Sequence, residues 1–109
     1  MPQLESTALN LRPQDLALLQ QLLARHTPQA QVWAYGSRVN GDGHDTSDLD
    51  LVLRWPADLS QDAPGWIDLQ DAIRDSLLPI LVDLHLWSRL PESFHRAIEK
   101  RYVVVQAGG

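Results

Sequence analysis

Residues 32–53 read VWAYGSRVNGDGHDTSDLDLVL, and this stretch decides which fold the chain adopts. A first apolar run ends at Gly36 and Ser37, and after ten intervening residues a second run begins at Asp48 and Asp50. Short β-favouring runs separated by Gly, Asn and Asp predict two strands with a loop between them. A tight turn therefore closes the first strand, and a pair of acids opens the second.

The Gly-Ser pair has the chemistry of a phosphate-binding turn. Gly36 has no Cβ, so the backbone can turn sharply there and bring its N–H groups against phosphate oxygens. Ser37 adds a hydroxyl donor, and a helix that started there would favour an anion at its N-terminal amides. We therefore expect Gly36 and Ser37 to bind phosphate.

The two acids that follow lie two residues apart on a predicted strand. Side chains at this spacing project from the same face, so Asp48 and Asp50 point together and Leu49, Leu51 and Leu53 point into the opposite layer. Two anionic oxygen ligands on one face suit Mg²⁺, which keeps several waters and shares its shell with substrate phosphates. The pattern predicts a metal site beside the phosphate-binding turn.

At these residues the chain resembles the DNA polymerase β-like nucleotidyltransferase superfamily. It is most similar to the minimal members, which are antitoxin partners of HEPN-domain toxins. The superfamily signature is Gly-Ser, a spacer, Asp-x-Asp and a third acid on a later strand, and Gly36, Ser37, Asp48 and Asp50 match it. The flanking residues typical of the minimal members are Tyr35, Arg38, Ser47 and Leu51. The specific motif is confined to residues 32–53, although the order of elements matches over nearly the whole chain.

The candidate for the third acid is Asp83, in the β-favouring run PILVDLHLW at residues 79–87. Strand periodicity predicts that one face carries Ile80, Val82, Leu84 and Leu86. It predicts that the other carries Leu81, Asp83, His85 and Trp87. An acid inside such a strand is costly unless a cation compensates its charge. A metal would do so.

Together these residues predict in-line nucleotidyl transfer with two Mg²⁺ ions. We expect Asp48 and Asp50 to hold the ion that bridges the triphosphate of ATP or another nucleotide. Asp83 with Asp50 is expected to bind or orient the ion at the acceptor hydroxyl. Gly36 and Ser37 would cradle the β and γ phosphates while pyrophosphate leaves. The three aspartates are therefore both the predicted metal ligands and the predicted catalytic residues.

The identity of the acceptor comes only from the resemblance. Likeness to the minimal members implies transfer of AMP to a tyrosine of a HEPN-type toxin, with this chain as its antitoxin. Two other functions stay open: a catalytically silent module that neutralises its partner by contact, and a transferase for a small molecule such as an aminoglycoside. The neighbouring reading frame discriminates among them, since a small all-helical protein with a HEPN motif supports the toxin pair.

Three further residues have two interpretations each. Arg38 adjoins the turn and is expected to steady the triphosphate, although it could instead pair with a structural acid. His85 could act as a base or orienter near the site, or be a hydrogen-bonded structural residue. Trp87 shares the predicted face of Asp83, but a packing role is favoured for it and for the other tryptophans. Those are Trp33, Trp55 and Trp66.

Composition narrows the class of protein. A chain of 109 residues indicates one domain over 1–109, too small for a separate substrate domain, and leaves a homo-oligomer open. The net charge of −5 argues against nucleic-acid partners, and the one small basic cluster, Arg96, Lys100 and Arg101, is interpreted as a solvated face. No apolar run predicts a membrane span or a leader, and the lack of cysteine fits a reducing cytoplasm.

The remaining elements alternate in a regular order. The periodic leucines from Gln14 to His26 predict a helix that includes Pro13 and stops before Thr27. Strands are expected over about 31–35, from the carboxylates to before Pro56, over 80–86 and over 103–105. Two further helices are expected, one with Trp66, Leu69, Ile73 and Leu77 on one face and one from Pro91 or Glu92 to Lys100. This order predicts an α+β nucleotidyltransferase fold, in which a small mixed sheet of three to four strands packs against three to four helices.

Overall fold

The computed structural model describes residues 3–4, 11–36 and 48–108. Its elements in chain order are β1 (Gln3–Leu4), α1 (Pro13–His26), β2 (Gln31–Tyr35), β3 (Leu49–Arg54), α3 (Trp66–Arg74), β4 (Val82–Leu86), the short 3₁₀ helix η2 (Trp87–Arg89), α4 (Glu92–Glu99) and β5 (Tyr102–Gln106). The predicted strands and helices are all present, with ends that differ by a few residues.

The five strands form one mixed sheet in the order β1-β5-β2-β3-β4. Strand β2 is antiparallel to both β3 and β5, whereas β3 and β4 are parallel. The α+β class and the mixed sheet are confirmed. The two-residue β1, parallel to β5, is an addition, because a polar lead-in is expected there from the sequence.

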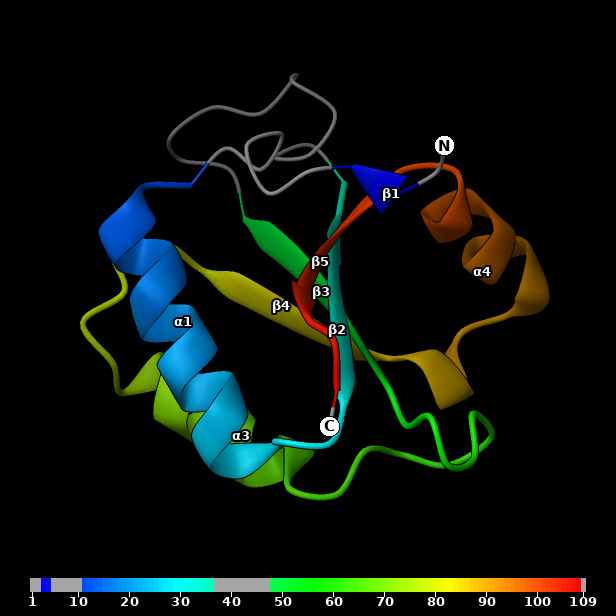
Figure 1. The fold of residues 1–109 in the computed structure, drawn as a ribbon, viewed down its shortest axis with the longest axis horizontal. Coiled ribbons are helices and arrows are strands. Elements are labelled where there is room, and N and C mark those ends of the chain that lie inside the picture. The colour runs from blue at the N-terminus through cyan, green and yellow to red at the C-terminus, as the bar shows by residue number, and fades with distance from the viewer. Residues whose placement is uncertain (1–2, 5–10, 37–47, 109) are drawn as a thin grey trace.

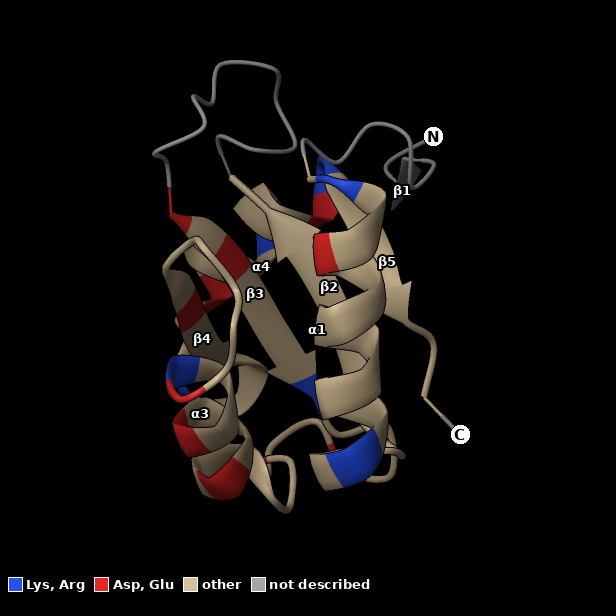
Figure 2. Cartoon of the chain, turned by 90° about the vertical axis from the view of Figure 1, so that its left-hand side faces the viewer, with Lys and Arg blue, Asp and Glu red and all other residues tan. Residues whose placement is uncertain are grey.

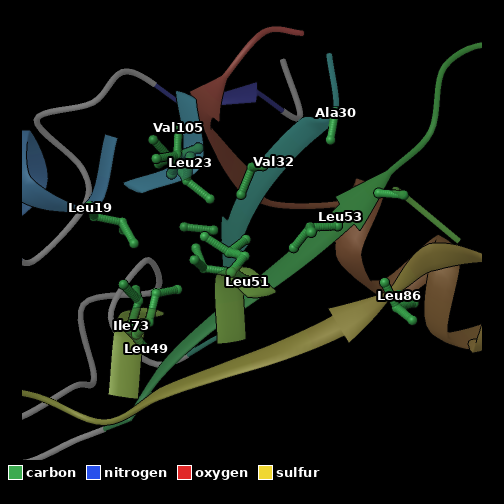
Figure 3. Packing of buried hydrophobic residues seen from close by; sticks show 14 residues of the cluster. Leu19, Leu23, Ala30, Val32, Leu49, Leu51, Leu53, Ile73, Leu86 and Val105 are labelled. Atoms are coloured by element: carbon green, nitrogen blue, oxygen red, sulfur yellow. The ribbon is translucent and has the colours of Figure 1, made fainter. Parts of the chain in front are cut away.

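Helices α1 and α3 cover one face of the sheet and α4 lies on the other (Figure 1). The main core lies under α1 and α3, where Leu19 and Leu23 of α1 meet Leu49, Leu51 and Leu53 of β3 (Figure 3). Leu69 and Ile73 of α3 complete this layer. The three leucines of β3 therefore face the core as their alternation predicts, which sends the intervening residues to the opposite face.

A smaller aromatic cluster fills the face under α4. Trp33 and Tyr35 of β2, Val52 of β3, Trp87 and Ile98 are buried in it. Trp33 stacks on the ring of Tyr102, and Arg54 lies 4.1 Å from the centre of the Trp33 ring. The packing role predicted for Trp33 is therefore confirmed.

Local signals explain where α1 begins and ends and where α3 begins. Helix α1 begins at Pro13 and ends at His26, and the Thr27 side chain and backbone N–H both bond to the carbonyl of Leu23. Helix α3 begins after Gly65, whose φ of +88° is a conformation that glycine adopts freely.

The prediction that Leu77 continues the apolar face of α3 is wrong. The helix ends at Arg74 with Asp75 as its C-cap, and Leu77 is 92% exposed. Strand β4 likewise starts at Val82, two residues later than expected. Among the described residues, no helix is long and apolar enough to cross a membrane.

Candidate active site

Three neighbouring strands bring a tyrosine and two acids side by side. Asp50 of β3 lies opposite Asp83 of β4 in the parallel register and opposite Tyr35 of β2 in the antiparallel register. Asp50 is partly buried, Tyr35 is buried, and Asp48 and Asp83 are exposed. Figure 2 shows the acidic positions of β3 and β4 on adjacent strands. The sheet thus places Asp83 next to Asp50, as the third-acid interpretation requires.

Gly36 follows β2 directly and approaches Asp50. Its φ is +86°, and a Cβ at this position would lie 2.6 Å from Oδ2 of Asp50. Real Cβ atoms essentially never come so close to an oxygen, so any larger residue would displace the carboxylate. Because residue 36 has no side chain, the Asp50 carboxylate can lie close to the end of β2.

The electrostatic environment of Asp50 disfavours its charge. Burial is the largest cause that raises the pKa of Asp50, and the neighbouring carboxylates Asp83 and Asp48 raise it further. Burial, Asp50 and Asp83 likewise raise the pKa of the Tyr35 hydroxyl, which stays neutral beside them. The negative charges of Asp48, Asp50 and Asp83 are therefore not fully balanced by neighbouring positive charges of the described residues.

His85 partly compensates this charge. Its Nε2 lies 3.8 Å from Oδ1 of Asp50, and this neighbour lowers the pKa of Asp50. The ring also lies 6.1 Å from the ring of Tyr35. His85 therefore belongs to the surroundings of Asp50, on the face that the strand periodicity of β4 predicts.

Trp87 belongs to the packing instead. Its ring stacks on His95 with 3.8 Å between centroids, and the His95 Nε2 lies 2.6 Å from the Trp87 carbonyl oxygen. Trp87 is buried in the aromatic cluster, so its predicted role as a core aromatic is confirmed. Trp55 and Trp66 are partly exposed.

The described acids offer the carboxylate oxygens that a hard cation prefers, but their side chains are not arranged around a common point. No group of three His, Asp or Glu side chains in the described ranges is arranged to hold a metal ion. The negative charges of Asp48 and Asp83 nevertheless repel that of Asp50 and raise its pKa. A divalent cation bound between carboxylates relieves such repulsion. The residues therefore fit Mg²⁺ by their oxygen ligands and their unbalanced charge.

Ser37 and Arg38 lie outside the described residues, as does the loop through 47. Of the predicted phosphate-binding turn, the structure describes Gly36 alone. The nucleotide-binding roles of Ser37 and Arg38 remain predictions from the sequence.

A groove of about 670 Å³ opens beside Gly36, and sequence reasoning missed it. The described residues that line it are Tyr35, Gly36, Phe94, Ala97, Ile98, Lys100 and Arg101. The antiparallel pairing of β5 with β2 places the residues before β5 next to the residues after β2, so Lys100 and Arg101 reach Gly36. The solvated-face interpretation holds for Arg96, which pairs with Glu92, but Lys100 and Arg101 line the groove. Nothing local in the sequence connects these residues with Gly36.

Comparison with known proteins assigns the fold to a family. A family model described as the central palm domain of mitochondrial-like poly(A) RNA polymerase matches residues 2–100. The chain belongs to this family. Residues 2–100 include both the Gly36 turn and the three aspartates, so the match spans the whole candidate site.

Two relatives agree with this assignment. The protein named "Probable protein adenylyltransferase MntA" of Haemophilus influenzae is 39% identical over 101 residues, which cover 90% of this chain and 84% of that protein. The mitochondrial poly(A) RNA polymerase of Drosophila melanogaster is 43% identical over 65 residues, or 55% of this chain and 11% of the polymerase. The chain is therefore a minimal nucleotidyltransferase, which confirms the resemblance seen in the Gly-Ser and Asp-x-Asp motif.

Proposed function

We propose that this minimal nucleotidyltransferase moves AMP from ATP to a hydroxyl group of a protein. The observation that carries the proposal is the position of Asp50, which contacts the Gly36 turn on one side and faces Asp83 on the other. A carboxylate placed between a phosphate-binding turn and a second acid can serve both the leaving phosphates and the incoming hydroxyl.

Gly36 is proposed to receive the phosphates. Its bare backbone allows the phosphate chain to approach while Asp50 stays in place beside it. Ser37 and Arg38, given roles from the sequence alone, would add a hydroxyl donor and a guanidinium to the same phosphates. The turn thereby orients the α-phosphorus toward the acids.

The acids are proposed as ligands of Mg²⁺. Asp48 and Asp50 would hold one ion and Asp50 with Asp83 a second, in agreement with the charge that the site leaves uncompensated. When bound, Mg²⁺ supplies Lewis-acid stabilisation of the charge that develops on the phosphates. His85, close to Asp50, orients that carboxylate.

The chemical step exchanges a phosphoanhydride bond of ATP for a phosphate ester on the acceptor. The acceptor oxygen attacks the α-phosphorus, the bond from this phosphorus to the bridging oxygen breaks, and pyrophosphate leaves with that oxygen. Asp83, the exposed member of the facing pair, takes the hydroxyl proton through its carboxylate oxygen. The products are an adenylylated acceptor and pyrophosphate.

The proposed acceptor is a tyrosine of a HEPN-type toxin, so the chain would act as an antitoxin. Similarity to a protein named an adenylyltransferase of proteins supports a protein acceptor over a small molecule such as an aminoglycoside. The net charge of −5 disfavours a long RNA acceptor, although the family includes poly(A) RNA polymerases. The lack of cysteine is compatible with a cytoplasmic reaction, where ATP and Mg²⁺ are at hand.

The test uses a HEPN-domain protein as the candidate acceptor. It is incubated with the wild-type chain, Mg²⁺ and α-labelled ATP, and the labelled residue is located by mass spectrometry. Replacement of the modified tyrosine by phenylalanine is the acceptor control, and an oligoadenylate of RNA is the competing acceptor.

We expect label on one tyrosine of the toxin and none after its replacement. A tight complex without any label would leave the catalytically silent antitoxin as the function. Label on the RNA in place of the toxin would contradict the protein acceptor and favour polymerase-like activity.

A further inference from the structure

The groove beside Gly36 is the strongest feature that the carboxylate site does not use. Its two walls come from distant parts of the sequence, Tyr35 and Gly36 at the end of β2, and the last turn of α4 with the residues after it. At about 670 Å³ it is the size of a small-ligand site. Gly36 lines the groove and also lies close to the Asp50 carboxylate, so the groove adjoins the proposed reaction centre.

Among the described residues, the cations that line the groove are Lys100 and Arg101, and both are exposed. In the described part of the chain, neither forms an ion pair with an acidic side chain. Arg96, on the same helix, pairs at 2.9 Å with Glu92. Lys100 and Arg101 are therefore available to an anion from outside, whereas Arg96 is already engaged.

Position at a helix C-terminus explains part of this arrangement, because cations there interact favourably with the helix dipole. The dipole does not explain why both side chains line a groove that ends at a glycine turn. The two roles can be distinguished by experiment. An interaction with the helix dipole changes the stability of the protein, whereas contact with a bound anion changes the affinity for that anion.

We propose that Lys100 and Arg101 bind the triphosphate chain of the nucleotide in the groove between β2 and α4. The proposal rests on the proposed function in one respect, that the ligand at Gly36 is a nucleoside triphosphate. Two cations on one side and the Asp48, Asp50 and Asp83 carboxylates on the other give the site opposite polarities at its ends. The polyphosphate lies toward the cations, and its α-phosphorus lies toward the acids.

A triphosphate fits this site better than a polynucleotide does. Two neighbouring cations can contact the phosphates of one triphosphate chain, whereas an RNA backbone needs a row of cations on a protein whose net charge is −5. Each cation that hydrogen-bonds to a phosphate adds more binding energy than a neutral pair would.

The experiment measures equilibrium binding of ATP, ADP and AMP by calorimetry, with Mg²⁺ present and no acceptor. The proteins are the wild type, the double variant Lys100→Ala, Arg101→Ala and the control Arg96→Ala, with Lys100→Arg as the charge-preserving variant. Melting temperatures are recorded for all four. Where transfer activity is present, KM for ATP and kcat are measured as well.

We expect the double variant to bind ATP at least about tenfold more weakly, ADP less affected and AMP nearly unchanged. KM for ATP should rise with little change in kcat. Arg96→Ala should behave as the wild type, and Lys100→Arg should lose less ATP affinity than the double variant because it keeps the positive charge. Unchanged ATP affinity in the double variant would overturn the proposal. So would equal losses for ATP and AMP. Because no acceptor is needed, nucleotide binding can succeed even if transfer to a toxin fails.

Discussion

The Oδ2 atom of Asp50 lies 2.6 Å from the point that a Cβ on Gly36 would occupy. The contact joins the turn after β2 to the acid inside β3, and the pairing of Tyr35 with Asp50 fixes their register. A side chain at position 36 would move the carboxylate away from the turn. Glycine is therefore required there by its neighbour as well as by its φ of +86°.

Replacing Gly36 by alanine should damage transfer more than stability. The positive φ costs an L-residue on the order of 1–3 kcal/mol, and the Cβ displaces the Asp50 carboxylate from its place beside the turn. We expect kcat/KM to fall by roughly 100-fold or more, because small displacements of reacting groups have effects of this size. Steady-state transfer assays and thermal unfolding measure the two quantities.

Gly65→Ala is the matched control for that variant. Gly65 also has a positive φ, +88°, and a Cβ there would meet the backbone carbonyl of His26, away from the acids. We expect it to lose about 2 kcal/mol or more of unfolding free energy while the folded protein keeps its activity. Wild-type kcat/KM in Gly36→Ala would show that Asp50 does not need its present position.

Removing the charge of Asp50 should stabilise the metal-free protein at neutral pH. Burial, then Asp83 and Asp48, raise the pKa of Asp50, so its ionised form is less favourable in the folded than in the unfolded chain. This cost is absent below the unfolded pKa, close to the ordinary value of 3.8, and grows as the pH rises through the folded pKa. Asp50→Asn should therefore have a higher free energy of unfolding than the wild type at pH 7, and this gain should vanish toward pH 4.

Denaturant unfolding in a chelating buffer at several pH values measures this gain. Asp71→Asn is the control, since Asp71 is exposed on α3 and pairs with Arg74. A stability loss in Asp50→Asn at pH 7 would mean that the site already compensates the carboxylate.

Divalent cations should stabilise the wild type through the same carboxylates. Repulsion among Asp48, Asp50 and Asp83 is relieved when a cation binds, and binding to the folded state alone raises stability by about 2.7 kcal/mol at 100 times the dissociation constant. We expect a rise in melting temperature with Mg²⁺ that is lost in the Asp48→Asn, Asp50→Asn variant. An equal rise in both proteins would place the cation elsewhere.

Replacing His85 by glutamine should shift the acid side of the pH–rate profile. His85 lowers the pKa of Asp50, so its loss raises that pKa further, and the ionised form of Asp50 is then reached only at higher pH. The acid limb of kcat/KM should move upward, whereas His26→Gln, at the far end of α1, should leave it in place. An unmoved limb would exclude Asp50 as the group that controls it.

The local part of this account could be predicted from the sequence. Alternation placed Leu49, Leu51 and Leu53 in the core, and the same rule put Asp83 and His85 on one face of β4. The prediction for Leu77 is wrong because the helical spacing of apolar residues continues beyond Arg74, where the helix ends.

The non-local part could not be predicted in this way. Lys100 and Arg101 look like a solvated helix end until the pairing of β5 with β2 brings them to Gly36. The closeness of Asp50 to Gly36 likewise depends on the register between β2 and β3, which periodicity leaves open. Both relations join residues far apart in the chain.

The central claim is that Asp50, held between Gly36 and Asp83, is the acid on which nucleotidyl transfer depends. The most direct measurement is the single-turnover rate of AMP transfer from α-labelled ATP in the wild type and in Asp50→Asn, with Mg²⁺ saturating and folding checked by circular dichroism. We predict transfer in the wild type and a loss of roughly 1,000-fold or more in the folded variant. Transfer by Asp50→Asn at the wild-type rate would contradict the account.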